Sequence, residues 1–323
     1  MKTVKVQDAI GQVLCHDVTQ IIPGVSKGAR FRKGHIIQEE DIPVLLSMGK
    51  ENIYIYEYDE NKYHENEAAN LLGKMAMGPN IYGKEPVEGK VDLFSSVDGL
   101  LKVKQDILFE INSIPQVMMA TKRTNQPVKK DEKIAGTRVI PLVIDREPVD
   151  QAVALGEGKN LLEVLPYQNL KAGIVTTGSE VYYGRIEDKF TDVIRNKMKR
   201  YGITEMGHEN STDDKNMIVE KIQSLLDRGA EVIFCSGGMS VDPDDNTPGA
   251  IGEVADRIIT YGSPVLPGAM FMLAYKGEVP MVGLPGCVMY SGRTVFDFIL
   301  PRIAAKDTIL REEICAMGHG GLL

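Results

Sequence analysis

Two stretches of this chain share a pattern that restricts the fold more than any other feature. Residues 171–184 read KAGIVTTGSEVYYG, and residues 231–248 read EVIFCSGGMSVDPDDNTP. Each begins with a short run of apolar and β-branched residues, stops at glycine and serine, and continues into carboxylates. Runs of this kind are typical of buried parallel strands, which carry their loops to one edge of a sheet. We therefore expect a binding site in these loops.

Strand and helix patterns alternate regularly from residue 170 onward. Amphipathic helices are expected over residues 186–202 and 211–229, another from Pro248, and a last one over residues 290–303. A third apolar strand, over residues 279–286, also ends in a glycine loop. This alternation predicts a mainly parallel sheet with helices on both faces, which is a three-layer α/β/α domain over residues 168–323.

The first 167 residues follow other patterns. Residues 1–60 show short strand-like segments punctuated by glycine, with a helix expected over 39–49 and a strand over 52–58, so we interpret them as a small β-rich segment. Residues 61–167 combine a helix over 64–78 with several apolar runs and are interpreted as an α+β module of undefined role. His64, Glu65 and Glu67 faintly resemble a metal-ligand set, but acids in the first turn of a helix are the simpler interpretation.

Composition excludes several classes of protein. The chain has 323 residues, 43% hydrophobic and 25% charged, as in soluble globular proteins, and a formal net charge of −8. With this acidic balance and no long basic run, a nucleic acid polymer is not an expected partner. The sequence has no signal pattern or membrane-spanning run, and its four cysteines lack metal-ligand spacing, so we expect a soluble, cytoplasmic protein that contacts no membrane.

Anion binding is the chemistry expected of the loops. The glycines after Ser236 allow main-chain N–H groups to approach a phosphate closely, and Ser240 adds a hydroxyl. Many carboxylates gather nearby, and they suit a phosphate site if a hard divalent ion such as Mg²⁺ bridges the two. The alternative is that these acids cap helices or face solvent: Glu180, Asp188, Asp213, Asp214, Asp242, Asp244 and Asp245. Cys235 is expected in the core, and Cys287 is expected to be an unreactive thiol beside the last loop.

Several ordered motifs resemble the molybdopterin-binding domain of molybdenum cofactor biosynthesis proteins: TTGSEVYYGRIEDKF, STDD, SGGMSVDPDDNTPGAI, LPGAMFMLAY and VGLPGCVMY. The resemblance covers residues 170–304 and extends to molybdopterin molybdotransferases, molybdopterin adenylyltransferases and gephyrin domains. It implies a site for the pterin and its phosphate at the carboxyl edge of the sheet, commonly with Mg²⁺. Asp188 and Asp245 would be the catalytic residues that hold the metal. The implied binding residues are Thr177, Gly178, Ser179, Glu180, Asp213, Asp214, Ser236, Gly237, Gly238, Ser240, Pro285 and Gly286.

Four positions depart from the family pattern. Ser179 stands where aspartate is usual, Asp242 where glycine is usual, Ala269 where lysine is usual, and Cys287–Val288 where Asn-Pro is usual. Losing a lysine and gaining an aspartate makes a phosphate site less hospitable to an anion unless a metal is held there.

The resemblance implies three alternative functions. The first is a transferase that performs Mg²⁺-assisted molybdate insertion or adenylyl chemistry on molybdopterin or its adenylylated form. The second is a non-catalytic carrier or sensor of molybdopterin that has lost active-site residues, which the four substitutions favour. The third is a nucleotide pyrophosphatase of the competence-damage-inducible type. Since relatives of this domain form dimers or trimers, a homo-oligomer is a further expectation.

Overall fold

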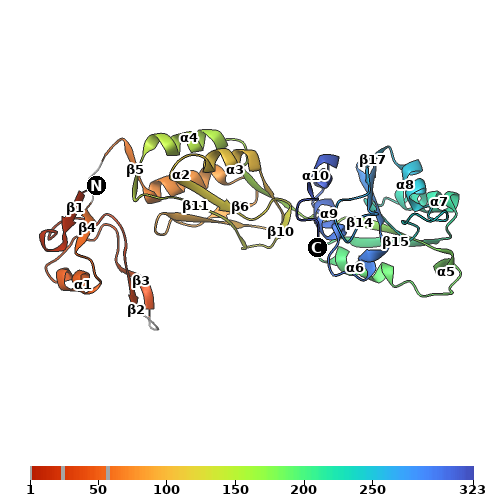
Figure 1. Ribbon diagram of the computed structural model, residues 1–323, viewed down its shortest axis with the longest axis horizontal. Helices are drawn as coiled ribbons and strands as arrows, with labels where there is room; N and C mark the ends of the chain where they lie inside the picture. The colour runs from red at the N-terminus through yellow and green to blue at the C-terminus, as the bar shows by residue number, and fades with distance from the viewer. Residues whose placement is uncertain (1, 23–25, 56–58) are drawn as a thin grey trace. The chain divides into compact units, whose positions relative to one another are not determined.

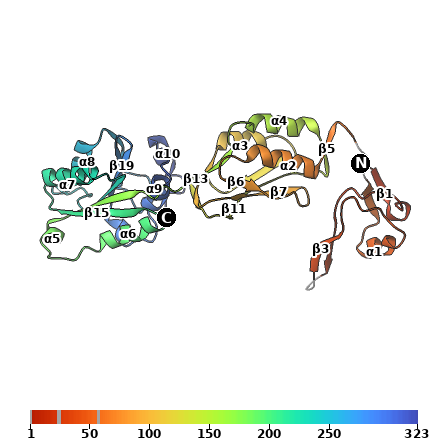
Figure 2. The same ribbon diagram turned by 180° about the vertical axis from the view of Figure 1, so that it is seen from behind.

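The computed structural model describes residues 2–22, 26–55 and 59–323 of the chain. The chain folds as two compact units (Figures 1 and 2). The first comprises Met1–Ser96, Val103–Thr124 and Asp131–Glu163, and the second comprises Val97–Lys102, Asn125–Lys130 and Val164–Leu323. Two short segments from the middle of the sequence therefore belong to the same unit as the C-terminal half. The predicted division at residues 60 and 167 stays a prediction.

The N-terminal segment folds around two antiparallel strand pairs, β1 with β4 and β2 with β3. Its apolar side chains, among them Leu14, Phe31 and Leu45, form a small buried core. The expected helix is confirmed as α1, and the expected strand is confirmed as β4 up to Ile55, since residues 56–58 lie outside the described part of the chain. The elements are β1 (Lys2–Lys5), η1 (Val6–Asp8), β2 (Val18–Ile22), β3 (Ser26–Phe31), α1 (Asp41–Ser47) and β4 (Asn52–Ile55).

The middle region is an α+β arrangement, as expected. An antiparallel sheet in the order β6-β7-β11-β9 carries α2, which packs against β7, β11 and α4. His64 begins α2 by accepting a hydrogen bond from the Asn66 N–H, while Glu67 accepts one from the His64 N–H, so these residues cap a helix. The elements are β5 (Lys62–His64), α2 (Glu65–Ala76), β6 (Ile81–Gly83), β7 (Lys90–Ser95), α3 (Gln105–Asn112), β9 (Val117–Thr121), β11 (Lys133–Val139), β12 (Val143–Asp145) and α4 (Arg146–Gly156).

A mainly parallel sheet forms the centre of the second unit. Within residues 164–323, all of which are described, six strands lie in the order β15-β14-β16-β19-β18-β17. The first four of these strands are mutually parallel, and β18 and β17 add an antiparallel edge. The elements from residue 171 on are β14 (Lys171–Thr177), α5 (Ser179–Tyr182), α6 (Phe190–Lys199), β15 (Thr204–Ser211), α7 (Lys215–Asp227), β16 (Val232–Ser236), α8 (Thr247–Val254), β17 (Arg257–Tyr261), β18 (Met272–Lys276), β19 (Val279–Leu284), η2 (Gly286–Met289), α9 (Val295–Ala304) and α10 (Arg311–Ala316). A separate small sheet has the order β10-β8-β13, with β8 (Gly99–Val103), β10 (Gln126–Val128) and β13 (Leu162–Pro166).

Helices cover both faces of the six-stranded sheet, which confirms the three-layer prediction. Ile174 of β14 lies in a core with residues of α6 and α9, whereas the next residue, Val175, lies in a core with residues of α7 and α8. Successive strand residues point to opposite faces, so a strand buried on both faces is apolar throughout. Figures 1 and 2 both show α7 beside α8, away from α6.

The sequence-based expectation missed some elements of this unit, namely β15, β17, β18 and α10, and placed the start of one helix too early. No strand was expected over Thr204–Ser211, because β15 lies at the sheet edge and carries polar, partly exposed residues instead of an apolar run. The helix expected over residues 290–303 begins at Val295, because the Thr294 N–H donates to the Asp297 carboxylate 2.8 Å away and fixes the first turn there. Among the residues that the structure describes, no helix combines the length and apolar character needed to cross a membrane.

Candidate functional site

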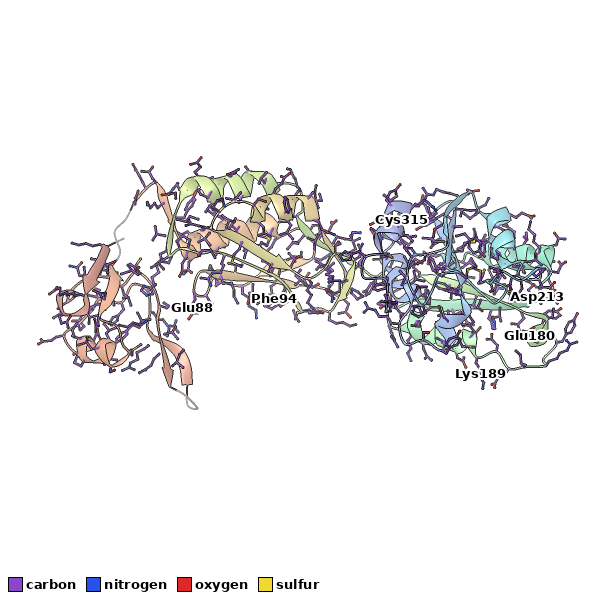
Figure 3. All side chains as sticks on the ribbon, viewed as in Figure 1. Glu88, Phe94, Glu180, Lys189, Asp213 and Cys315 are labelled. Atoms are coloured by element: carbon purple, nitrogen blue, oxygen red, sulfur yellow. The ribbon has the colours of Figure 1, made fainter. Side chains whose placement is uncertain are left out.

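Three loops begin side by side at the carboxyl edge of the parallel strands. Thr176 is in register with Ser236, and Ser236 is in register with Leu284, so β14, β16 and β19 end at the same level. Figure 3, in which both residues are labelled, shows Glu180 and Asp213 together at one end of this domain. In open α/β sheets, this edge is where ligands bind.

The loop after β16 places its backbone where only glycine fits. Gly237 and Gly238 have φ angles of 87° and 55°. A Cβ atom on Gly237 would lie 2.1 Å from the Thr177 carbonyl oxygen, and one on Gly238 would lie 2.7 Å from Thr247 Oγ1. Within the described residues, the main-chain N–H groups of Gly238 and Ser240 donate to no acceptor. The loop therefore offers free main-chain donors of the kind that bind anions.

Hydrogen bonds connect this glycine loop to its neighbours. Thr177 Oγ1 lies 3.0 Å from Thr247 Oγ1, and Asn246 Nδ2 donates to the Asp213 carbonyl oxygen at 2.9 Å. The Ser179 N–H and hydroxyl both donate to Asp213 Oδ2, at 2.9 and 2.8 Å. The structure thus brings Thr177, Ser179 and Asp213 together with the glycine loop.

Asp188 lies beneath these loops with its carboxylate fully hydrogen-bonded. Its Oδ1 accepts from the N–H groups of Phe190 and Thr191 at 2.9 and 3.0 Å. Its Oδ2 accepts from the hydroxyls of Thr176 and Thr191 at 2.9 and 2.6 Å. Burial acts to raise the pKa of the Asp188 carboxyl, but the bonds from Thr191, Thr176 and Phe190 outweigh it and hold that pKa below its usual value.

His208 extends this network from β15. Its Nε2 lies 3.0 Å from Thr176 Oγ1 and 3.6 Å from Asp188 Oδ2. Since the Thr176 hydroxyl donates its proton to Asp188, His208 Nε2 is the donor to Thr176 Oγ1. The ring therefore orients the hydroxyl that in turn holds the carboxylate.

These contacts bear on Mg²⁺ binding. A carboxylate has about four lone-pair positions, and four donors occupy those of Asp188. Over the described parts of the chain, no group of three or more His, Cys, Asp or Glu side chains is arranged to hold a metal ion. Asp188 as placed does not fit a metal ligand, and we derive no step through Mg²⁺. The assignment of Mg²⁺ to Asp188 and Asp245 stays a prediction.

The other predicted residues make only local contacts or none with the glycine loop. Asp214 caps α7 by accepting from the Met217 N–H at 2.9 Å, and Asp245 closes a turn by accepting from the Asp242 N–H at 3.0 Å. Gly178 and Pro285 are buried, whereas Glu180, Ser240 and Gly286 are exposed. Hydrogen bonds between described residues do not connect Pro285 or Gly286 to the glycine loop.

The two cysteines near the site are not activated. Cys235 is fully buried in β16, and burial raises its pKa to about 12. Burial also raises the pKa of the Cys287 thiol. A reactive thiolate needs the opposite shift, so neither thiol has the environment of a nucleophile.

Sequence reasoning missed four residues that complete the site: Thr176, Thr191, His208 and Asn246. Thr176 adjoins the predicted Thr177, so the polar end of an apolar strand was a usable signal. His208 lies on β15, which has no apolar pattern, so no spacing in the sequence marks it. Thr191 follows Asp188 by three residues at the start of α6, so the usable signal was an acid placed to accept from the first turn of a helix.

The fold and the loops define a class: an α/β domain whose described residues include unpaired main-chain donors at the carboxyl edge of its parallel strands. Comparison with known families narrows this class. Residues 173–305 match the family model described as a probable molybdopterin binding domain, and residues 3–57 match one described as a domain of unknown function. Residues 173–305 therefore form a domain of the molybdopterin-binding family, and the resemblance seen in the motifs is confirmed.

Individual relatives cover only part of the chain. A CinA-like protein of Sulfurihydrogenibium sp. is 36% identical over 92 residues, which are 28% of this chain and 23% of the relative. A CinA-like protein of Mycobacterium avium is 30% identical over 96 residues, 29% of this chain and 22% of the relative. The chain thus spans less than a quarter of these relatives. The crystal structure of the molybdopterin biosynthesis enzyme MoaB from Thermus thermophilus is similar at a TM-score of 0.38 and 23% identity, covering 41% of this chain and 91% of that one.

Proposed function

We propose that this protein binds molybdopterin at the carboxyl edge of β14, β16 and β19, and that it serves molybdenum cofactor biosynthesis. Membership of residues 173–305 in the molybdopterin-binding family supports the identity of the ligand. The observation that carries the proposal is the glycine loop, in which side chains are excluded at Gly237 and Gly238 and the N–H groups of Gly238 and Ser240 have no described acceptor. Those donors would bind the phosphate of the pterin.

Each residue of the site has a defined part in this binding. The main-chain donors would hold the phosphate, while Thr177 and Thr247 fix the glycine loop by their 3.0 Å hydroxyl contact. Ser179 donates two hydrogen bonds to Asp213. The Asp213 carboxylate is therefore directed at protein donors and not at the anion. The Ser179 hydroxyl thereby reduces the repulsion that an anion would meet from an acidic site.

A specific observation favours the non-catalytic form of this function. Catalysis with Mg²⁺ requires carboxylates with free oxygens, whereas Asp188 has all four acceptor positions occupied. A carrier or sensor needs only the phosphate site. We therefore propose a molybdopterin carrier first, and molybdate insertion or adenylyl transfer as the alternative.

Binding and turnover separate these two proposals. The purified chain would be titrated with molybdopterin, and then incubated with molybdopterin and Mg²⁺ together with ATP or molybdate. A carrier binds the pterin but transfers no AMP, releases no AMP from adenylylated molybdopterin and inserts no molybdate. Turnover would establish the transferase, and failure to bind molybdopterin or its adenylylated form would refute both. A Gly237→Ala variant should lose binding, whereas Gly249→Ala on α8 should retain it.

The similarity to CinA-like proteins supports a third proposal, a nucleotide pyrophosphatase. It predicts that a nucleoside diphosphate sugar is hydrolysed to a nucleoside monophosphate and a sugar phosphate. Chromatography of the reaction products tests this directly. Intact substrate after prolonged incubation with Mg²⁺ would exclude this activity, and molybdopterin binding would be unaffected by that result.

A further inference from the structure

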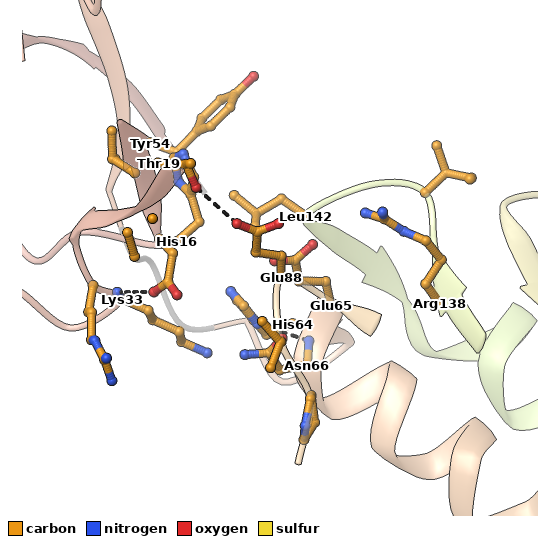
Figure 4. Close-up of a pocket in the computed structure, with 18 of the residues that line it drawn as sticks. His16, Thr19, Lys33, Tyr54, His64, Glu65, Asn66, Glu88, Arg138 and Leu142 are labelled. Atoms are coloured by element: carbon orange, nitrogen blue, oxygen red, sulfur yellow. Dashed lines mark hydrogen bonds between the residues drawn. The ribbon is translucent and has the colours of Figure 1, made fainter. Parts of the chain in front are cut away.

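A second polar pocket lies in the first compact unit, outside the molybdopterin-binding domain (Figure 4). Its volume is about 810 Å³, within the range of pockets that take organic ligands and far larger than an inorganic anion needs. Residues of the N-terminal segment and of the middle region both line it. Two hydrogen bonds join its walls, from Thr19 Oγ1 to Glu88 Oε1 at 2.9 Å and between His64 Nε2 and the Cys15 carbonyl oxygen at 2.8 Å.

Four basic side chains line this pocket: Arg32, Lys33, Lys50 and Arg138. None of the four charged groups lies within ion-pair distance of a carboxylate in the described part of the chain. Elsewhere in this unit, basic groups such as those of Lys62, Lys90 and Lys133 do form such pairs. Four unpaired cations around one cavity are a site for an anion.

Burial and the basic side chains both act on the pKa values of three titratable groups that line the pocket. Burial is the main reason that the pKa of His16 is lowered, and Lys50 lowers it further. Burial likewise lowers the pKa of His64, with Lys33 adding to the effect. Burial raises the pKa of Glu65, against which Arg138 and Lys33 act. Lys33, Lys50 and Arg138 therefore each act on a titratable side chain that lines the pocket.

His16 also lines the pocket, and one of its polar atoms is unpaired in the described part of the chain. Its Nδ1 is buried and has no hydrogen-bond partner within the described residues. Buried polar atoms are nearly always paired, so this nitrogen is an exception in the pocket wall. The N–H groups at the start of α2 are already used, since Glu65 N donates to Leu142 O and Asn66 N donates to His64 Nδ1.

The carboxylates of the pocket indicate which other groups the ligand carries. Asp17 accepts from the Lys33 N–H, and Glu88 accepts from Thr19 through one oxygen. Within the described residues, the carboxylate of Glu65 and the second oxygen of Glu88 remain free to accept hydrogen bonds from a ligand. Figure 4 shows these two residues next to each other. A ligand that filled the cavity would thus carry an anionic group and also hydrogen-bond donors.

We propose that this pocket binds a phosphorylated organic molecule of mononucleotide size. Its phosphate contacts Lys33 and Lys50, and its heterocyclic N–H donors face Glu65 and Glu88. The site is separate from the proposed molybdopterin site, and its occupation does not depend on that function.

Calorimetric titration of the full-length protein with AMP, GMP, CMP, UMP and orthophosphate tests this proposal. At least one mononucleotide should bind at millimolar concentration or below and should raise the melting temperature, whereas orthophosphate should bind at least about tenfold more weakly. The double variant Lys33→Gln/Lys50→Gln should lose this binding. Both side chains are exposed, so the variant should fold normally, as circular dichroism would verify.

Arg123→Gln is the matched control, because Arg123 is an exposed arginine of the same unit that does not line the pocket. It should bind the mononucleotide as the native chain does. Absence of binding by all four mononucleotides would overturn the proposal. Unchanged binding by the lysine double variant, or orthophosphate binding as tight as that of the best mononucleotide, would also overturn it.

Discussion

Asp188 and Asp213 are carboxylates that hydroxyl and amide donors hold in place. Ser179 donates twice to Asp213, and Thr176 and Thr191 donate to Asp188. Hydrogen bonds to the charged form hold the pKa of the Asp188 carboxyl below its usual value. The effect of a substitution at this edge is therefore set by the donor that it removes or the charge that it adds.

Replacing Ser179 by aspartate tests the pairing with Asp213. The new carboxylate would lie where the Ser179 hydroxyl now donates to Asp213 Oδ2 at 2.8 Å. Loss of this donor and repulsion between two carboxylates should lower the free energy of unfolding by roughly 1–3 kcal/mol. Ser179→Asn adds similar bulk without charge and should cost less. Thermal unfolding measures both variants, and equal melting temperatures for the two would contradict the electrostatic explanation.

The pH dependence of stability tests the network around Asp188. Because the pKa of this carboxyl is lower in the folded state, its contribution is present above its unfolded pKa of about 3.9 and is lost as pH falls through the folded value. Asp188→Asn should therefore cost roughly 1–3 kcal/mol at neutral pH, since four donors lose their charged acceptor. Below about pH 4, the difference between the variant and the native chain should shrink.

Urea unfolding followed by circular dichroism, at neutral pH and again near pH 3.5, measures this difference. The control is Glu220→Gln, which removes an exposed carboxylate on α7. It should change stability little at either pH. A cost for Asp188→Asn that stays constant through the acid range would contradict the assignment.

At the scale of elements, the glycine loop depends on how closely β14 and β16 end. The two strands are in parallel register up to Thr176 and Ser236, which brings the Thr177 carbonyl against the backbone of the next loop. A strand pair with this register leaves no room for a side chain at Gly237. The shape of the glycine loop is thus a product of strand pairing more than of any one side chain.

Gly237→Ala should distort this loop. Its Cβ would lie 2.1 Å from a carbonyl oxygen at a φ of 87°, so we expect a loss of at least about 2 kcal/mol in unfolding free energy. Gly249→Ala lies in α8, where the nearest atom to the new Cβ is Lys215 Cε at 3.6 Å. That variant should gain up to about 1 kcal/mol from helix propensity. Urea unfolding compares the two, and equal stabilities would contradict the steric explanation.

At the scale of the whole molecule, segments far apart in sequence share one unit. Lys102 Nζ donates to both oxygens of Asp307 at 2.9 Å, across 205 positions of the chain. Asp307 also accepts from the buried Arg302 at 2.6 Å, and Arg302 pairs with Glu313. The second unit therefore includes a segment, Val97–Lys102, that lies far from residues 168–323 in the sequence.

Lys102→Met tests whether this distant segment stabilises the second unit. Lys102 and Asp307 are only 23% and 10% exposed, so breaking their pair should cost about 1–3 kcal/mol, more than a surface pair is worth. Lys306→Met removes a pair with Glu231 that is 58% and 40% exposed, and it should cost at most about 1 kcal/mol. Urea unfolding of both variants measures the contrast. Equal costs would show that the segment containing Lys102 adds little.

The sequence by itself determined the elements whose signals are local. The apolar runs of β14, β16 and β19, the amphipathic helices α6, α7 and α8, and the glycines after β16 predicted a mainly parallel sheet with an anion-binding edge. These signals suffice because burial on both faces of a strand, or on one face of a helix, constrains neighbouring residues in the chain itself.

Only the tertiary structure decided which polar groups meet at that edge. Phe190 and Thr191 donate to Asp188 from the neighbouring turn, but Thr176 reaches it from β14, and His208 reaches Thr176 from a polar edge strand that leaves no apolar pattern. Lys102 joins Asp307 from a different region of the sequence altogether. Hydrogen bonds and ion pairs depend on distances of a few ångströms between elements, and residue order alone does not encode them. For this reason the sequence predicted an edge of the sheet as the site, and the fold decided which protein donors Asp188 and Asp213 accept from.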